Sequence, residues 1–233
     1  MIPTLEQLLD LFAVYNARIW PMQIVAYLLG IAGFVLAFRR GNLSNRLIPA
    51  ILAFFWLWVA FVFWLPNALG GFAPGYLFAG IFLIQGLLFL VQVVRQKLVF
   101  GYQASLAAWL GIFFVLYALV GYPLFGVLIG HAYPHAPPFG LTPCPLITFS
   151  FGLFLMTSQK MPKALLIIPF CYALSGILWV SIGVLEDIGM VLSGLLGVGL
   201  IWARDAKVAA VHLSEASPAS ADAGWSLDLA DKK

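Results

Sequence analysis

The sequence predicts an all-α integral membrane protein with seven transmembrane helices. Of its 233 residues, 63% are hydrophobic and only 9% are charged, whereas a soluble domain carries roughly a quarter charged residues. Apolar stretches close to the ~20 residues that a helix needs to cross a bilayer recur along the chain. Strands of membrane β-barrels are about ten residues long and alternate in polarity, so a helical bundle is favoured over a barrel.

The candidate spans are joined by short loops that carry most of the cations. The spans are Ile19–Phe38, Leu47–Leu65, Ala73–Val94, Ser105–Ile129, Thr142–Ser158, Lys163–Val184 and Ile188–Trp202. Lys and Arg follow the first, third, fifth and seventh spans, and the alternate loops contain none. Because cationic loops stay on the cytoplasmic side, we expect the N-terminus outside and the C-terminus in the cytoplasm.

Two shorter segments flank the predicted membrane domain, 19–204. Residues 1–18 contain Thr4 and Gln7 at capping-box spacing and a shared apolar face, which predicts a short amphipathic helix on the membrane surface. They contain no Lys or Arg before Asn16, so no cleavable signal peptide is expected. Residues 205–233 are rich in Ala, Ser and Asp, which predicts a disordered cytoplasmic tail.

A weak internal repeat relates the first three spans to the last three. "WPMQIVAYLLGIAGFVLAFRR" is followed by "RLIPAILAFFWLW", and "TPCPLITFSFGLFLMTSQK" is followed by "KALLIIPFCYALSGILW". Both triplets begin outside, so the pattern predicts a parallel 3+1+3 repeat about an axis along the membrane normal, as in some transporters.

The stretch "GHAYPHAPPFGLTPCPL", Gly130 to Leu146, interrupts the apolar chain. His131, His135 and Cys144 are a candidate ligand set for zinc, copper or haem. The prolines between them make a regular helix unfavourable, so the His-x3-His spacing does not place both rings on one face. The alternative is a stiff external cap with no cofactor, which is the simpler interpretation.

The fifth span is short. From Leu146 to Ser158 it offers about 20 Å of helix, against ~30 Å of hydrocarbon. Non-helical backbone at membrane depth is tolerated where protein or a water-filled cavity surrounds it. The Pro-rich loop, 131–145, is therefore expected to close the outer mouth of a cavity, although Tyr133 and Phe139 also suit anchors in the membrane interface.

Few polar side chains lie in or next to the spans. The candidates for lining a cavity or touching a substrate are Trp20, Gln23, Gln85, Tyr133, Cys144, Glu186 and Asp187. The simpler interpretation of the Glu-Asp pair is a solvated turn at a helix start, and the alternative is a proton relay or cation site with His131. The two glutamines are typical of hydrogen bonds between helices.

Several of these residues also carry a family resemblance. His131-Ala-Tyr-Pro134, Thr142-Pro-Cys-Pro145, Phe149-Ser-Phe-Gly152, Trp20-Pro-Met-Gln23 and Glu186-Asp187 resemble the pattern of an uncharacterised bacterial multi-pass membrane family, domain of unknown function 6064 (DUF6064). Leu146 and Ile147 stand where that family tends to have threonines. The resemblance covers nearly everything except the tail and implies a bacterial inner-membrane protein, without implying an activity.

Three functional hypotheses follow. The first is a small-solute transporter or permease, the second a metal- or haem-associated redox protein, and the third a non-catalytic accessory subunit. No nucleophile and base are paired in the sequence, so an enzyme is not favoured. The last span has no lysine for a retinal Schiff base. The expected partners are the lipid bilayer and either a second copy or another membrane subunit; the cations lie in loops, which does not suit nucleic acid.

Overall fold

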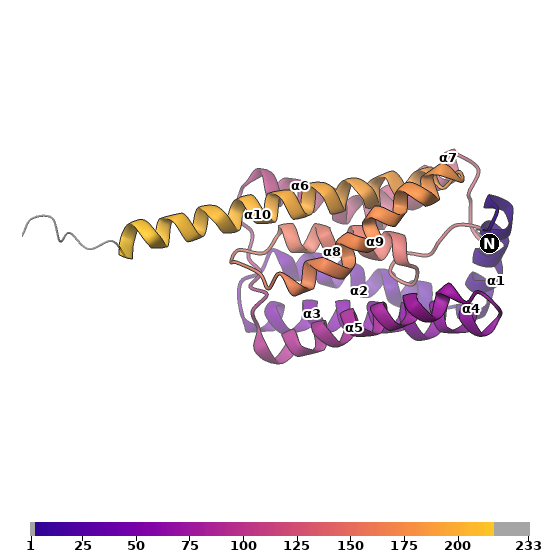
Figure 1. The fold of residues 1–233 in the computed structure, drawn as a ribbon, viewed down its shortest axis with the longest axis horizontal. Coiled ribbons are helices and arrows are strands. Elements are labelled where there is room, and N and C mark those ends of the chain that lie inside the picture. Colours follow the sequence, from indigo (N-terminus) through magenta and orange to yellow (C-terminus); the bar gives the residue numbers. More distant parts are fainter. Residues whose placement is uncertain (1–2, 217–233) are drawn as a thin grey trace, which may run out of the picture.

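The computed structural model describes residues 3–216, with side chains up to Ala206, and is built from helices (Figure 1). The helices are α1 (Leu5–Ile19), α2 (Met22–Ala37), α3 (Asn42–Trp58), α4 (Leu65–Leu69), α5 (Pro74–Arg95), α6 (Leu106–Leu116), α7 (Tyr122–Leu128), α8 (Pro143–Leu155), α9 (Ala164–Ser181) and α10 (Ile188–Ala216). Extended pairing within residues 3–216 is limited to one isolated antiparallel bridge between Phe100 and Thr157. The predicted all-α class is confirmed.

Two of the long helices contain π-helical turns. Segment η1 (Val59–Trp64) joins α3 to α4, and η2 (Tyr117–Gly121) joins α6 to α7. In each case a proline lies two positions after the last residue of the π-helical segment, Pro66 or Pro123. A proline has no N–H and its ring crowds the carbonyl four residues earlier, so a wider turn before it relieves the conflict. Both turns contribute buried side chains to the core, Phe63 and Trp64 from η1 and Leu119 from η2.

Five helices in the described chain are long and apolar enough to cross a membrane: Asn42–Leu69, Pro74–Arg95, Leu106–Leu128, Ala164–Ser181 and Leu185–Ala206. A sixth span results if α1 and α2, which meet at 89°, are taken as one broken span. Helix α8 has 13 residues, about 20 Å at 1.5 Å per residue, which is shorter than the hydrocarbon layer. Helices therefore lie where the seven spans were predicted, but the count of seven spans is not confirmed.

The short helix α8 forms the centre of the bundle. All its residues except Cys144 are buried, and it contacts α3, α6, α9 and α10. The α6 contact is close: a methyl group on Gly152 would lie 2.8 Å from the Val115 backbone nitrogen. The Ser150 hydroxyl donates to the Leu146 carbonyl and accepts from the Trp56 indole N–H. Because protein surrounds α8, its length does not have to match the lipid.

The first helices of the two proposed repeats are packed differently. Helix α2 buries five of its 16 residues, whereas α8 is buried on all sides. This asymmetry gives the 3+1+3 repeat no support, so the repeat stays a prediction that superposition of the two triplets tests.

The cationic loops gather at one end of the bundle. The Arg204 guanidinium donates to the Thr157 carbonyl at 2.6 Å, and Lys163 Nζ lies 5.2 Å from the centroid of the Trp202 ring. The Ser158 backbone N–H donates to the carbonyl of Val99 at 2.8 Å. Loops that were expected to share one side of the membrane thus meet at one end, and the assignment of that end to the cytoplasm stays a prediction.

Helix α10 projects past this end (Figure 1). It runs to Ala216, so the first part of the predicted disordered tail, 205–233, is helical in the structure. Residues 203–216 contain no Gly or Pro and are rich in Ala, the strongest helix former, so nothing in them ends the helix. The remainder of the predicted tail, 217–233, lies outside the described residues.

Candidate functional site

Helix α1 lies across the end of the bundle opposite to the projecting end of α10 (Figure 1). The Thr4 hydroxyl accepts from the Gln7 backbone N–H and the Gln7 side chain accepts from the Thr4 backbone N–H, so the predicted capping box is present. The helix turns its aromatic residues inward: the Tyr15 hydroxyl donates to the Leu141 carbonyl at 2.8 Å and accepts from the Trp58 indole N–H at 2.9 Å. The contact with Leu141 attaches α1 to the Pro-rich loop.

Asn16 strengthens this attachment. Its side chain is fully buried, and its amide nitrogen donates to the carbonyls of Pro134 at 2.7 Å and Ala136 at 2.8 Å. The amide of Gln23, at the start of α2, donates to the Asn16 carbonyl at 2.9 Å. The Pro-rich loop has few regular backbone hydrogen bonds of its own. Polar side chains from α1 therefore hold it in place.

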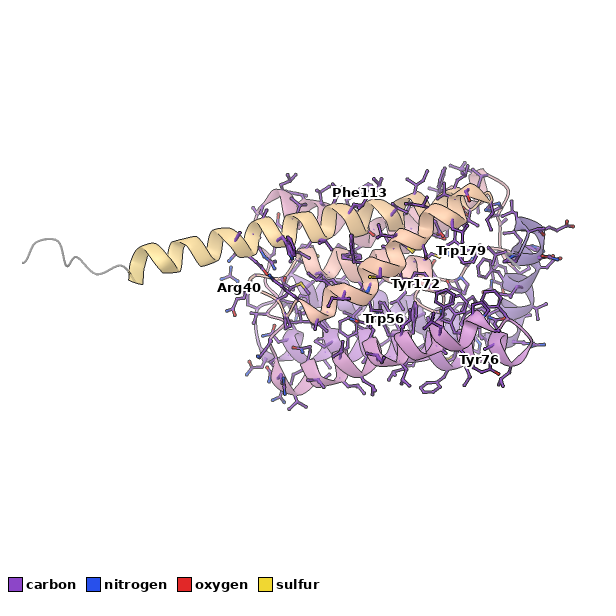
Figure 2. All side chains as sticks on the ribbon, in the orientation of Figure 1. Arg40, Trp56, Tyr76, Phe113, Tyr172 and Trp179 are labelled. Carbon is purple, nitrogen blue, oxygen red and sulfur yellow. The ribbon has the colours of Figure 1, made fainter. Side chains whose placement is uncertain are left out.

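Beneath α1 lies a cavity of about 130 Å³, which we call the aromatic cavity. It is lined by Pro3, Leu8, Leu11, Phe12, Phe63, Trp64, Asn67, Phe72, Tyr122, Pro143, Cys144, Tyr172, Trp179, Val184 and Asp187. Its walls come from α1, the π-helical turn of η1, the start of α8, the middle of α9 and the short turn before α10. Tyr172 and Trp179 lie on the half of α9 that faces the α1 end (Figure 2).

The position of this cavity corrects one detail of the predicted cap. Residues of the Pro-rich loop were expected to close it, but within 131–145 only Pro143 and Cys144 line it. The covering residues are those of α1 and Pro3, which precedes it. The loop contributes by holding α1 in place. This contact joins segments more than 100 residues apart in the sequence, so helix periodicity does not reveal it.

Glu186 and Asp187 lie in the short 3-10 turn Leu185–Asp187, next to the aromatic cavity. Both side chains are 0% exposed, so the interpretation of the pair as a solvated turn is wrong. Glu186 Oε1 lies 2.7 Å from Nδ1 of His131. The hydroxyl of Tyr122 donates to Asp187 Oδ1 at 2.5 Å. The turn packs under α7 and the loop that follows it, which excludes water from both carboxyl groups.

Three polar atoms around the cavity have no partner among the described residues. They are Oδ2 of Asp187 and the indole nitrogens of Trp64 and Trp179. Each belongs to a residue of the cavity wall. Buried polar groups are nearly always hydrogen-bonded in folded proteins. A cluster of one unpaired acceptor and two unpaired donors around a single cavity is therefore a candidate ligand site.

The structure brings together only part of the predicted site. Cys144 and Asp187 line the aromatic cavity, and Glu186 adjoins Asp187. Trp20 and Tyr133 are largely exposed, at 61% and 63%. Gln23 and Gln85 are hydrogen-bonded elsewhere, the former to α1 and the latter to the Leu165 carbonyl at the start of α9. The two glutamines thus link helices, as was expected of them from the sequence.

The proposed metal ligands are separated. His131 is engaged by Glu186, His135 is half exposed with its nearest carboxylate, Asp10, 3.9 Å away, and Cys144 faces the aromatic cavity. Within residues 3–216, no three His, Cys, Asp or Glu side chains are grouped so as to hold a metal ion. The intervening prolines direct the two imidazoles to different neighbours.

The aromatic residues of the site were not predicted. Trp64, Tyr122, Tyr172 and Trp179 sit within apolar spans, where a ring is indistinguishable in sequence from an ordinary packing residue. Pro66 and Pro123 were an available signal, because a proline inside an apolar span disturbs the helix before it, and π-helical turns are common at functional sites.

Long apolar helices around a buried short helix define an all-helical protein compatible with insertion in a membrane. The chain belongs to the family of unknown function DUF6064, whose model matches residues 5–211, as its sequence motifs predicted. No curated protein and no solved structure matches the chain.

Proposed function

We propose that this protein is a small-solute permease of the bacterial cytoplasmic membrane, with the aromatic cavity as its solute site. The observation that carries the proposal is a cavity large enough for a small organic molecule, bordered by a buried carboxylate whose second oxygen has no partner in the described chain. Ligand sites are typically concave and mostly apolar, with a few polar groups that fix orientation.

The arrangement around the cavity suits gated access. On one side the cavity is covered by α1, which is attached to the bundle by hydrogen bonds from Tyr15 and Asn16 and by burial of Phe12 and Ile19 in the core. On the other side α8 fills the bundle centre. Displacement of α1 opens the cavity to the α1 end, and release to the opposite end requires a shift of helices around α8. By the Lys and Arg distribution, the α1 end is the external one.

The cavity can be blocked with a matched pair of substitutions. Cys144→Leu adds bulk inside the aromatic cavity, whereas Cys171→Leu makes the same change at an exposed position on α9. Cells that express the wild type, either variant or an empty vector are grown in defined medium, and the depletion of small solutes from the medium is followed by mass spectrometry. Size-exclusion chromatography of each purified variant checks that it is folded, because overpacking costs about 1–3 kcal/mol.

The expected result is that at least one solute disappears faster with the wild type and with Cys171→Leu than with the vector. Cys144→Leu should match the vector. Equal depletion profiles in all four strains contradict the permease and favour an accessory subunit.

A further inference from the structure

The two buried carboxyl groups beside the aromatic cavity differ in their partners. The Glu186 carboxyl group is paired with His131 at 2.7 Å. Asp187 makes no ion pair within the described residues, and its Oδ2 atom accepts no hydrogen bond there. A charged carboxylate removed from water is strongly unfavourable without a cation beside it. The wall of the cavity therefore contains an acceptor that a positively charged ligand would neutralise.

The rings around the cavity suit a cation as well. Trp64 and Tyr172 have ring centroids 6.4 Å apart, and Trp64 lies 5.0 Å from Phe63 and 6.2 Å from Phe72. Trp179 completes this wall from the next turns of α9. Indole, phenol and phenyl faces carry partial negative charge and attract ammonium groups, most strongly when water is excluded. Rings of three types thus line the same cavity as Asp187.

A metal ion fits this cavity poorly. Magnesium and calcium take six or more oxygen ligands at about 2.0–2.6 Å, whereas here a single unpaired carboxylate oxygen stands among rings and aliphatic side chains. An organic cation needs no full oxygen shell, because its alkyl groups are stabilised by apolar contact. The unpaired indole N–H groups of Trp64 and Trp179 suit a hydroxyl or carbonyl oxygen on the same ligand.

We infer that the aromatic cavity binds a small organic cation, a quaternary or protonated amine, with Asp187 as its counter-ion and Trp64, Tyr172 and Trp179 as its aromatic walls. The size agrees: the cavity measures about 130 Å³, and an engineered cavity of about 150 Å³ holds benzene. This inference rests on the proposed function in that it takes the same cavity as the solute site, and it adds the class of solute.

The test uses full-length protein in lipid nanodiscs and two probes of nearly equal shape. Tetramethylammonium is charged, and tert-butanol is neutral with the same number of non-hydrogen atoms. Binding is measured by titration calorimetry and by tryptophan fluorescence, since two indoles line the cavity. We expect the wild type to bind tetramethylammonium at least roughly tenfold more tightly than tert-butanol, because a desolvated cation–π contact alone supplies a preference of that order.

Asp187→Asn should remove this preference while leaving tert-butanol binding nearly unchanged. Asp10→Asn makes the same chemical change at an exposed carboxylate on α1 and should leave the preference intact. If Asp187→Asn does not yield folded protein, Trp179→Phe and Trp179→Leu replace it. The phenyl ring should keep the preference for the cation, and leucine should lower it several-fold.

Equal binding of the two probes by the wild type overturns the inference, and so does a preference that survives both Asp187→Asn and Trp179→Leu. Uptake separates this failure from failure of the permease. Cation binding without solute uptake contradicts the permease and leaves the cation site standing. Uptake of a neutral solute that Cys144→Leu blocks, without any preference for tetramethylammonium, supports the permease and overturns the cation site.

Discussion

Removal of the Asn16 side chain is expected to expose the aromatic cavity. In Asn16→Ala the carbonyls of Pro134 and Ala136 lose donors at 2.7 and 2.8 Å. A buried group left unpaired costs about 1–3 kcal/mol. Because Pro134 and Ala136 are only half-buried, the low end of this range applies, and the two together should weaken the attachment of α1 by about 2 kcal/mol. Since 1.4 kcal/mol corresponds to tenfold in an equilibrium constant, the displaced form of α1 should become roughly 30-fold more populated.

Cys144 reports this change, because it lines the cavity beneath α1. In a Cys171→Ser background it is the single thiol of the chain, and its rate of reaction with a small maleimide measures how often α1 is displaced. Asn16→Ala should raise that rate by roughly 30-fold. A bulky maleimide should react slowly with the parent protein and gain even more from the substitution.

Two controls separate displacement of α1 from general unfolding. Asp10→Asn alters an exposed residue on the outer face of α1 and should leave the labelling rate unchanged. A cysteine at Ser150, buried in the middle of α8, should stay unreactive with and without Asn16→Ala when Cys144 is replaced by serine. An unchanged rate at Cys144, or an equal rise at position 150, would refute the assignment of α1 as the cover of the cavity.

Three further outcomes are expected. His131→Ala leaves a fully buried carboxyl group without its partner, which should lower the free energy of unfolding by about 3–5 kcal/mol; denaturant titration in detergent that finds under 1 kcal/mol contradicts the pairing. Gly152→Ala forces a methyl group against the backbone of α6 and should cost about 1–3 kcal/mol, whereas Gly199→Ala, with open space around it inside α10, should stabilise by up to about 1 kcal/mol. A cysteine at Asn67 should react with an impermeant external reagent in intact cells and one at Gly41 should not; the reverse pattern inverts the orientation.

The sequence was informative where a property is local. Hydrophobicity is summed over neighbouring residues, so the helices lie close to the predicted spans, and the capping box of Thr4 and Gln7 forms within a single turn. The short helix before Ser158 was also recognisable, because prolines set its start at Pro143. Sequence length alone did not show whether such a helix crosses lipid or lies inside protein.

The site depended on contacts between distant residues. Asn16 meets Pro134 across 118 positions, and Tyr122 meets Asp187 across 65. Neither pair leaves a periodic pattern, and a Glu-Asp pair at a loop has the same sequence whether water or a packed helix covers it. From the sequence, a position of His131 beside the acidic pair was only an alternative. The packing of the turn before α10 against α7 brings His131 and Glu186 together.

By itself the sequence determined that this is an all-helical, apolar, membrane-type chain of the DUF6064 family, because composition, periodicity and motif are written residue by residue. The tertiary structure alone decided that α8 is enclosed by protein, that α1 covers the aromatic cavity, and that Asp187 is buried with no ion-pair partner among the described residues. The physical reason is that burial is a property of the assembled helices: which face of a uniformly apolar helix meets lipid, protein or a cavity is set by its neighbours, and a polar residue acquires its partner only when they pack.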